Sequence, residues 1–399
     1  MSAYLLDWFS LLVRWAHIVT GIAWIGSSFY FVWLDNHLEP PERPDGEPGV
    51  AGELWSVHGG GFYRARKYQV APEVLPRTLH WFYWEAYSTW ITGSLLLTAL
   101  YFVQASAYLV DPSVLPLSRP AAIGIALAFI VGGWLVYDGL CRSPLRRNGR
   151  NLALSVAGLA VVLAFGLCQV FGGRGAFIVY GACLGTIMVA NVFFVIIPGQ
   201  RELVQAKQEG REPDPQPGLK GKQRSVHNTY FTLPVLFVMI SNHYAMAWGG
   251  HGNWLVLIAL SFAGACLRAW FVLRHKAQWR ALPTANLPLY AGLVTLALVV
   301  TALEPVPNYT GAVAAPDPAQ VRAIVTQRCA PCHARKPTQA GFNAPPNGIV
   351  LESPQQLRAR LPDVRKQLAL RAMPLGNLTQ MTEAERAGLL AWVDAGAGG

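Results

Sequence analysis

Eight long apolar stretches occupy the first three quarters of the chain, and they limit its possible folds more than any other feature. They cover residues 8–34, 80–103, 121–140, 152–171, 175–197, 230–248, 254–273 and 288–303. Most of them reach or approach the ~20 apolar residues that a helix needs to cross a bilayer. Only 14% of the residues are charged, against about 25% in an ordinary soluble domain. We therefore predict an all-α fold built on an eight-helix transmembrane bundle in a lipid bilayer.

The Lys and Arg residues of the loops predict how this bundle is oriented. The loops after the first, third, fifth and seventh stretches hold 18 of them, whereas the other loops hold only Arg119 and Arg174. Loops rich in Lys and Arg remain in the cytoplasm, so both ends of the bundle are expected on the opposite side. The net charge of +10 then reflects membrane topology, and no nucleic-acid partner is predicted.

The composition changes after Leu303. Residues 304–318 contain four prolines and are predicted to form a semi-rigid linker. Residues 319–399 are more charged and lack a membrane-like stretch. We therefore divide the chain into a transmembrane domain (1–303), the linker and a small C-terminal domain (319–399), which lies on the side opposite to the basic loops.

The C-terminal domain contains the segment Cys329-Ala-Pro-Cys-His333, a C-x-x-C-H motif typical of covalent c-type haem attachment. Two thiols three positions apart reach the two vinyl groups of one porphyrin, and His333 then meets the iron from one face. A zinc site needs further Cys or His ligands nearby, and this domain offers none. A lone disulfide does not explain the adjoining histidine. We therefore predict a cytochrome c domain that carries haem c.

Met373 is the predicted sixth ligand of this haem iron, and Met381 is the second choice. A His/Met ligand pair raises the haem potential, which suits an electron acceptor. Haem is attached to such motifs outside the bacterial cytoplasmic membrane, where the loop charges independently place the domain. The predicted location is thus the bacterial inner membrane, with a periplasmic N-terminus and cytochrome c domain.

Ionisable side chains inside a bilayer are costly and mark functional sites by default. His17 in the first stretch and His243 near the outer end of the sixth are candidate ligands of a haem b. Arg14, one helical turn from His17, is a candidate partner for a haem propionate. The alternative is that each histidine only bonds a neighbouring helix, worth about 1 kcal/mol, and that Arg14 extends to the interface.

A second set of ionisable residues lies toward the cytoplasmic side. His80 opens the second stretch and His227 opens the sixth. They are candidates for ligating a second haem or for lining a substrate pocket, with Glu85 as a proton acceptor. The alternative is that both histidines are interfacial and solvated. The Gly-rich segment 59–64 is interpreted as a solvated basic loop.

Several of these segments together resemble the bacterial membrane-bound urate oxidases, known as urate hydroxylases of the PuuD type. The resemblance covers essentially the whole chain and rests on Trp15–Ile18, Trp24–Gly26, His80–Glu85, His227–Pro234, Ser241–Tyr244 and Cys329–His333. The first stretch also resembles the haem-binding helix of the membrane protoporphyrinogen oxidase family, which favours His17 as a haem b ligand.

The resemblance implies oxidation of urate to 5-hydroxyisourate, with electrons passing through haem to a soluble cytochrome c or a terminal oxidase and no hydrogen peroxide formed. A base among His80, Glu85 and His227 then deprotonates urate or water. If urate binds at the cytoplasmic side, electrons must cross a hydrocarbon core of about 30 Å, which predicts a second redox cofactor inside the bundle. The alternatives are a quinol-oxidising electron-transfer protein, a porphyrinogen oxidase, and a transporter with a cytochrome sensor. The lack of clear Gly/Pro-broken helix pairs disfavours the transporter.

Overall fold

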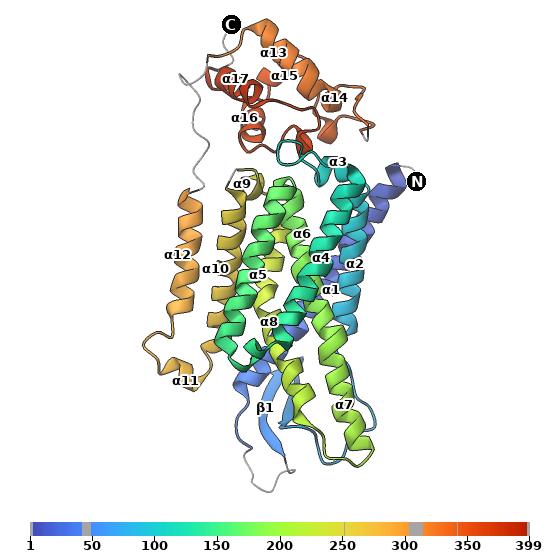
Figure 1. Ribbon diagram of the computed structural model, residues 1–399, viewed down its shortest axis with the longest axis vertical. Helices are drawn as coiled ribbons and strands as arrows, with labels where there is room; N and C mark the ends of the chain where they lie inside the picture. Colours follow the sequence, from blue (N-terminus) through green and yellow to red (C-terminus); the bar gives the residue numbers. More distant parts are fainter. Residues whose placement is uncertain (1–2, 42–48, 251, 303–313, 341, 397–399) are drawn as a thin grey trace.

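Long helices make up most of the structure, a computed structural model that describes residues 3–41, 49–250, 252–302, 314–340 and 342–396 (Figure 1). Among these described residues, five helical segments are long and apolar enough to cross a membrane. Three are the helices α4 (Arg119–Arg142), α5 (Gly149–Val170) and α10 (Asn253–Leu273). The other two are Trp8–His37 of α1 (Ala3–His37) and a segment that joins α6 (Gly173–Asn191), the π-helical turn η3 (Val192–Ile196) and α7 (Ile197–Gln208).

Helices also lie on the other three predicted stretches. They are α2 (Trp84–Leu96), which continues into the π-helical η1 (Leu97–Phe102), then α8 (Pro215–Ser241) and α12 (Leu287–Ala302). With 16 residues, α12 is shorter than the ~20 that cross a bilayer, and α8 begins with a polar segment. The five long apolar helices make the chain compatible with a multi-pass membrane protein.

The fifth and sixth predicted stretches have the wrong boundaries. The sixth stretch was expected at 230–248, but α8 already begins at Pro215, where the Asp214 carboxylate accepts a hydrogen bond from the Gln216 N–H (2.9 Å) and caps the helix. After Ser241 the chain turns into the short α9 (Ala245–Trp248). The fifth stretch was expected to end at 197, but η3 changes the hydrogen-bond register just before Pro198 and the helix continues into α7.

A two-stranded antiparallel sheet corrects the all-α prediction. Strand β1 (Val50–His58) pairs with β2 (Gly61–Tyr68), so that His58 lies opposite Gly61. The turn between them is Gly59–Gly60, both with positive φ (+57° and +81°), as the favoured two-residue hairpin turn requires. Arg64, taken from sequence as part of a solvated loop, instead pairs with the buried Glu53 carboxylate (2.6 Å).

The C-terminal domain is a set of short helices around its own apolar core, built by Val321, Leu357, Leu389 and Trp392 among others. The helices are α13 (Pro318–Ile324), η4 (Val325–Cys329), α14 (Ala330–His333), η5 (Pro346–Gly348), α15 (Pro354–Arg358), α16 (Leu361–Ala369), η6 (Leu375–Asn377) and α17 (Glu383–Asp394). Most of the predicted linker (304–313 of 304–318) and the loop residue Arg43 lie outside the described residues.

Figure 1 shows this domain at one end of the helical part, which we call the domain end, beside α9 and the short α3 (Ala105–Tyr108). The β-hairpin, the C-terminal end of α7 and the short α11 (Ala277–Arg280) lie at the opposite end, the hairpin end. A one-turn 3-10 helix, η2 (Pro144–Arg147), connects α4 to α5. The C-terminal domain, which carries the C-x-x-C-H segment, and the β-hairpin therefore lie at opposite ends of the long helices.

Apolar side chains cover the outside of the long helices. Trp15 and Ile22 on α1 are each 66% exposed, and Val162 on α5 is 65% exposed. The buried core lies instead between α4, α5, α6 and α8, where Phe171, Phe177 and Leu167 are fully buried. Exposed apolar surface of this extent is unusual for a protein in water, and it agrees with helices that face lipid.

Candidate functional site

The C-x-x-C-H segment lies where η4 passes into α14. Cys329 ends η4 and His333 ends α14, so one helical turn carries both thiols and the imidazole. Burial, with Cys332 nearby, raises the pKa of the Cys329 thiol to about 12, and burial also raises the pKa of Cys332. Both are free thiols, and their raised pKa keeps them protonated at neutral pH. Among the described residues no group of three His, Cys, Asp or Glu side chains is placed to hold a metal ion.

The His333 ring has one nitrogen fixed and one nitrogen available. Its Nδ1 lies 2.9 Å from the Ile349 carbonyl oxygen. A carbonyl only accepts hydrogen bonds, so Nδ1 carries the hydrogen and Nε2 carries the lone pair. Histidines that ligate metals use this same arrangement to hold the ring and its tautomer.

The two candidate methionines have different surroundings. Met381 is buried in the apolar core of the C-terminal domain (3% exposed), whereas Met373 is half-buried outside that core. The Met373 carbonyl accepts a hydrogen bond from Arg386 Nη1 (2.7 Å). Met373 therefore keeps the more accessible thioether of the two, on a backbone that is held in place.

An ion pair connects the C-x-x-C-H segment to the methionine-bearing segment. Arg328, next to Cys329, contacts the Glu385 carboxylate (2.9 Å) and also donates to the Thr379 carbonyl (2.5 Å). Burial alone raises the pKa of Glu385, but the hydrogen bonds from Arg328 outweigh it and the pKa is lowered. Glu385 is therefore ionised at neutral pH and completes the pair.

His17 lies on α1 against α2. Its Nδ1 is 3.1 Å from the Thr89 carbonyl oxygen and 3.0 Å from Thr92 Oγ1, and the ring packs directly on Gly93. As for His333, the carbonyl fixes the hydrogen on Nδ1 and leaves the Nε2 lone pair available. Arg14 is exposed and its Nε lies 3.4 Å from Ser10 Oγ.

The structure places His243 at a different level from His17. His243 is exposed in the turn after α8, and its neighbour Asn242 accepts a hydrogen bond from Tyr101 in η1 (2.7 Å). Thr92 and Tyr101 are nine residues apart on the continuous α2–η1 helix, roughly 13 Å along its axis. Ligation of one haem by both histidines stays a prediction.

A cavity of about 970 Å³ lies in the hairpin half of the long helices. Its walls come from α1, α7, α8 and the loop that precedes α2, and they combine apolar and aromatic side chains with a few polar ones. The aromatic members are Trp24, Phe31, Tyr68, Trp81 and Phe82, and the polar ones include Ser28, Asp35, His80, Gln200, Ser225, Asn228 and Thr232. Ligand sites in proteins have this size and this composition.

Of the three predicted catalytic residues, the structure brings only His80 to the cavity. His80 lies in the loop before α2, with its ring 4.7 Å from that of Phe82 in an edge-to-face contact. Glu85 lies in the first turn of α2, and its Oε2 is buried without a hydrogen-bond partner. His227 lies in the middle of α8, where its Nδ1 is 2.7 Å from the Tyr137 hydroxyl.

A buried polar network adjoins the cavity and was missed from the sequence. Arg224 of α8 donates to the Asp138 carboxylate (2.6 Å) and to the side-chain oxygen Oδ1 of Asn191 (3.4 Å). Asn191 donates in turn to Tyr137 (3.0 Å) and Asn228 (2.8 Å). These residues come from three helices that are far apart in sequence, so no local sequence pattern predicts that they form a network. The isolated polar residues Asp138 and Asn191 in otherwise apolar stretches were the available signal.

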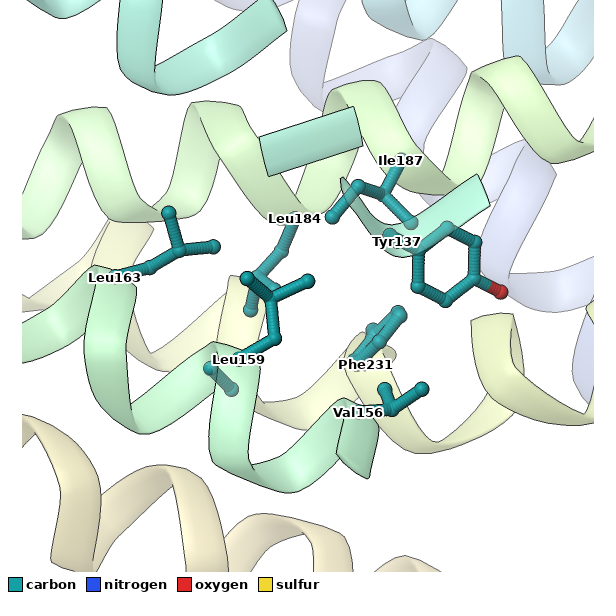
Figure 2. Close-up of a pocket in the computed structure, with 8 residues that line it drawn as sticks. Tyr137, Val156, Leu159, Leu163, Leu184, Ile187 and Phe231 are labelled. Carbon is teal, nitrogen blue, oxygen red and sulfur yellow. The ribbon is translucent and has the colours of Figure 1, made fainter. Parts of the chain in front are cut away.

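Beside this network lies a second, apolar pocket, in which Figure 2 shows the Tyr137 hydroxyl pointing away from the other labelled side chains. It has no room for a water molecule, and its lining comes from α4, α5, α6 and α8. The labelled residues are Tyr137, Val156, Leu159, Leu163, Leu184, Ile187 and Phe231. This pocket belongs to the packed core, so the larger cavity is the candidate substrate site.

The fold and these sites define a mostly helical protein, compatible with multi-pass insertion, that presents a large internal cavity and a separate C-x-x-C-H segment. The sequence model of a family described as urate oxidase N-terminal matches residues 3–303, and the chain belongs to this family. Membership supports an oxidoreductase that acts on urate. The C-terminal domain lies outside the match. Neither the curated proteins nor the solved structures contain a match to the chain.

Proposed function

We propose that the chain is a membrane-bound urate oxidase of the PuuD type, which makes 5-hydroxyisourate and passes electrons through haem to a cytochrome c or a terminal oxidase. Urate and water give 5-hydroxyisourate, two protons and two electrons, so no hydrogen peroxide is formed. The observation that carries the proposal is the cavity of about 970 Å³ inside the family-matched region, with the C-x-x-C-H segment at the opposite end of the helices.

The cavity suits a flat purine. The side chains of Trp24, Phe31, Trp81 and Phe82 offer aromatic faces for stacking. Ser225, Asn228 and Thr232 lie at spacings of three and four residues along α8, so they share one helical face that lines the cavity. This polar stripe gives hydrogen-bond partners to the edge of a heterocycle held between the aromatic walls.

The protons of the reaction need an acceptor beside the cavity. His80 is the candidate base that lines it, and it is exposed, so it can exchange protons with solvent at the hairpin end. His227 lies behind the polar stripe, bonded to Tyr137. We assign His80 the role of base, and His227 and Glu85 roles in maintaining the polar surroundings.

The residues present fit a covalent haem c. Cys329 and Cys332 would hold the porphyrin, His333 would present Nε2 to the iron because Ile349 holds Nδ1, and Met373 would be the second protein ligand. Haem supplies one-electron acceptor chemistry when bound. The chain itself contributes the fixed histidine tautomer and the Arg328–Glu385 pair that connects both ligand segments.

His17 fits the second, membrane-embedded haem that the distance requires. It lies seven residues from the cavity residue Trp24 along α1, roughly 10 Å nearer the domain end. Its Nε2 lone pair is available because Thr89 and Thr92 hold Nδ1. A haem held here lies between the substrate cavity and the C-terminal domain.

The loop charges support the proposed orientation in a bacterial inner membrane. The β-hairpin, α7 and α11 carry several of the basic residues, and Figure 1 places the hairpin, the C-terminal end of α7 and α11 at the hairpin end. The positive-inside rule assigns that end to the cytoplasm. The C-terminal domain and the N-terminus then face the periplasm, where an external cytochrome c has access.

Anaerobic mixing with urate tests the proposed function. We expect the oxidised holoprotein to be reduced at the haem by urate, with two electrons per urate and no hydrogen peroxide when an acceptor is supplied. Absorbance of reduced haem and a peroxide assay make the measurement. Reduction by a quinol or a porphyrinogen, with none by urate, would contradict the proposal and favour one of the alternative membrane cytochromes.

A pyridine haemochrome assay tests the membrane haem. We expect both b-type and c-type signals in the purified protein, and loss of the b-type signal alone in His17→Ala. His37→Ala is the matched control on the same helix, because its ring lies at the end of α1, where it bonds the Trp33 carbonyl (2.7 Å) and packs on His275 (4.4 Å). A pure c-type spectrum in the wild type would rule out the membrane haem.

A further inference from the structure

We propose that Asn228 is the purine-recognition residue of the cavity, held in one amide orientation by Arg224 through Asn191. The inference rests on the proposed function, because it names how that cavity selects its substrate. It is drawn from the donor and acceptor chemistry of the buried network.

Arg224 fixes the direction of the network. A guanidinium only donates hydrogen bonds, so the atom of Asn191 that faces Arg224 Nη1 must be the carbonyl oxygen. Arg224 cannot turn away, because its Nη2 is bound to the Asp138 carboxylate (2.6 Å) and its side chain is 5% exposed. The orientation of the Asn191 amide therefore follows from chemistry.

Asn191 then fixes Asn228. Its Nδ2 donates to Asn228 Oδ1 (2.8 Å) and to the Tyr137 hydroxyl (3.0 Å). On the other side, Asn228 Nδ2 donates to the Met188 carbonyl (2.9 Å). If the Asn228 amide were flipped, its NH₂ group would face the Asn191 NH₂ group and its oxygen would face the Met188 carbonyl oxygen. Both hydrogen bonds would then be lost.

The fixed amide has capacity left for a ligand. A primary amide offers two N–H donors and two acceptor lone pairs, and these contacts use one donor and one acceptor. One N–H and one lone pair remain on a side chain that lines the cavity. A neighbouring donor and acceptor of this kind match the H–N–C=O edge of a lactam, which is the edge that an oxidised purine such as urate presents.

The neighbours of Asn228 extend this recognition surface. Thr232, one turn further along α8, donates its hydroxyl hydrogen to the Asn228 backbone carbonyl (2.9 Å), so its lone pairs remain as acceptors. Ser225 lies one turn earlier on the same face. His227, one of the three catalytic candidates from the sequence, directly precedes Asn228 in the chain. Its side chain therefore lies on a different face of α8 and contacts Tyr137.

Direct binding of urate tests the inference, with equilibrium dialysis of radiolabelled urate on the detergent-solubilised full chain. We expect Asn228→Ala to weaken urate binding roughly 10- to 100-fold, as expected for two lost hydrogen bonds. The matched control is Thr229→Ala, a buried neighbour that does not line the cavity and whose hydroxyl donates to the Ser225 carbonyl within the helix (3.0 Å). Unchanged binding in Asn228→Ala, or an equal loss in the control, would overturn the inference.

An isosteric variant and a set of urate analogues distinguish a loss of recognition from a loss of the folded state. Asn228→Asp keeps the side-chain size but removes the N–H and repels anionic urate, so we expect a similar loss of affinity. N-methylated urates each lack one lactam N–H. We expect one of them to bind the wild type more weakly than urate does, but to bind Asn228→Ala as tightly as urate does. If none of them shows this coupling, the amide does not read the purine edge. Binding of urate by the wild type without haem reduction would instead refute the proposed function alone.

Discussion

Replacing both Cys329 and Cys332 by Ser is expected to abolish covalent haem and urate-driven reduction of an external acceptor. The two thiols lie on one helical turn with His333, and no other cysteine in the described residues has an adjoining histidine. The measurements are haem-specific staining after denaturing electrophoresis and anaerobic reduction of a soluble cytochrome c by urate. Urate binding to the cavity should persist, because the cavity lies at the other end of the long helices.

The matched control for this prediction is Cys266→Ser. Cys266 is a half-buried free cysteine of α10 that contributes nothing to the C-x-x-C-H segment. This variant should retain covalent haem and urate-driven reduction. Covalent haem that survives in the double variant, or is lost in the control, would show that the thiols at 329 and 332 are not the attachment points.

The His333 ring is oriented by a contact that no sequence pattern contains. The motif predicted the ligand, but only the structure shows that the Ile349 carbonyl, 16 residues away, holds Nδ1. The same device recurs at His17, where Thr89 is 72 residues away. Local patterns predict which residue type binds a metal, whereas the group that orients it comes from a different element and depends on tertiary packing.

The helices themselves were largely predictable, because apolar runs are local signals. The hairpin at 50–68 was predictable too, since Gly59–Gly60 between alternating residues is a two-residue turn signal. The hairpin was missed because its basic residues were interpreted as part of a solvated loop. The early start of α8 at Pro215 also had a signal, the Asp-Pro pair of an N-cap followed by a helix start.

The recognition network could not be predicted in the same way. Asp138, Asn191 and Arg224 lie on α4, α6 and α8, and 86 residues separate the first from the last. Asp138 and Asn191 looked like isolated polar residues, and Arg224 was counted as a basic residue of a cytoplasmic loop, whereas the structure buries it in α8. Their donor and acceptor roles become fixed only when the three helices pack. The sequence therefore indicated that polar groups lie inside the bundle, but not which hydrogen bonds they form or which side chain they orient.

Gly249→Ala and Gly376→Ala are expected to release the C-terminal domain from the domain end of the long helices. A Cβ on Gly249 would lie 1.8 Å from the Leu370 carbonyl oxygen, and one on Gly376 would lie 2.6 Å from that of Ala107. Both obstacles are backbone atoms, so the two parts must move apart. Because Leu370 and Gly376 flank Met373, these contacts hold the segment with the candidate haem ligand against α9 and α3.

The expected size of the effect follows from overpacking, which costs about 1–3 kcal/mol and corresponds to a roughly 5- to 150-fold shift toward the undocked state. Faster hydrogen exchange and proteolysis of residues 370–377 measure it, together with slower urate-driven reduction of the C-terminal haem. Gly250→Ala is the matched control for Gly249, because a Cβ there meets nothing within 4 Å. Gly348→Ala matches Gly376, since it has the same left-handed backbone (φ +68° against +52°) but no neighbour. If the controls change exchange as much as the test variants do, backbone strain is the cause and the domain is not held by these two contacts.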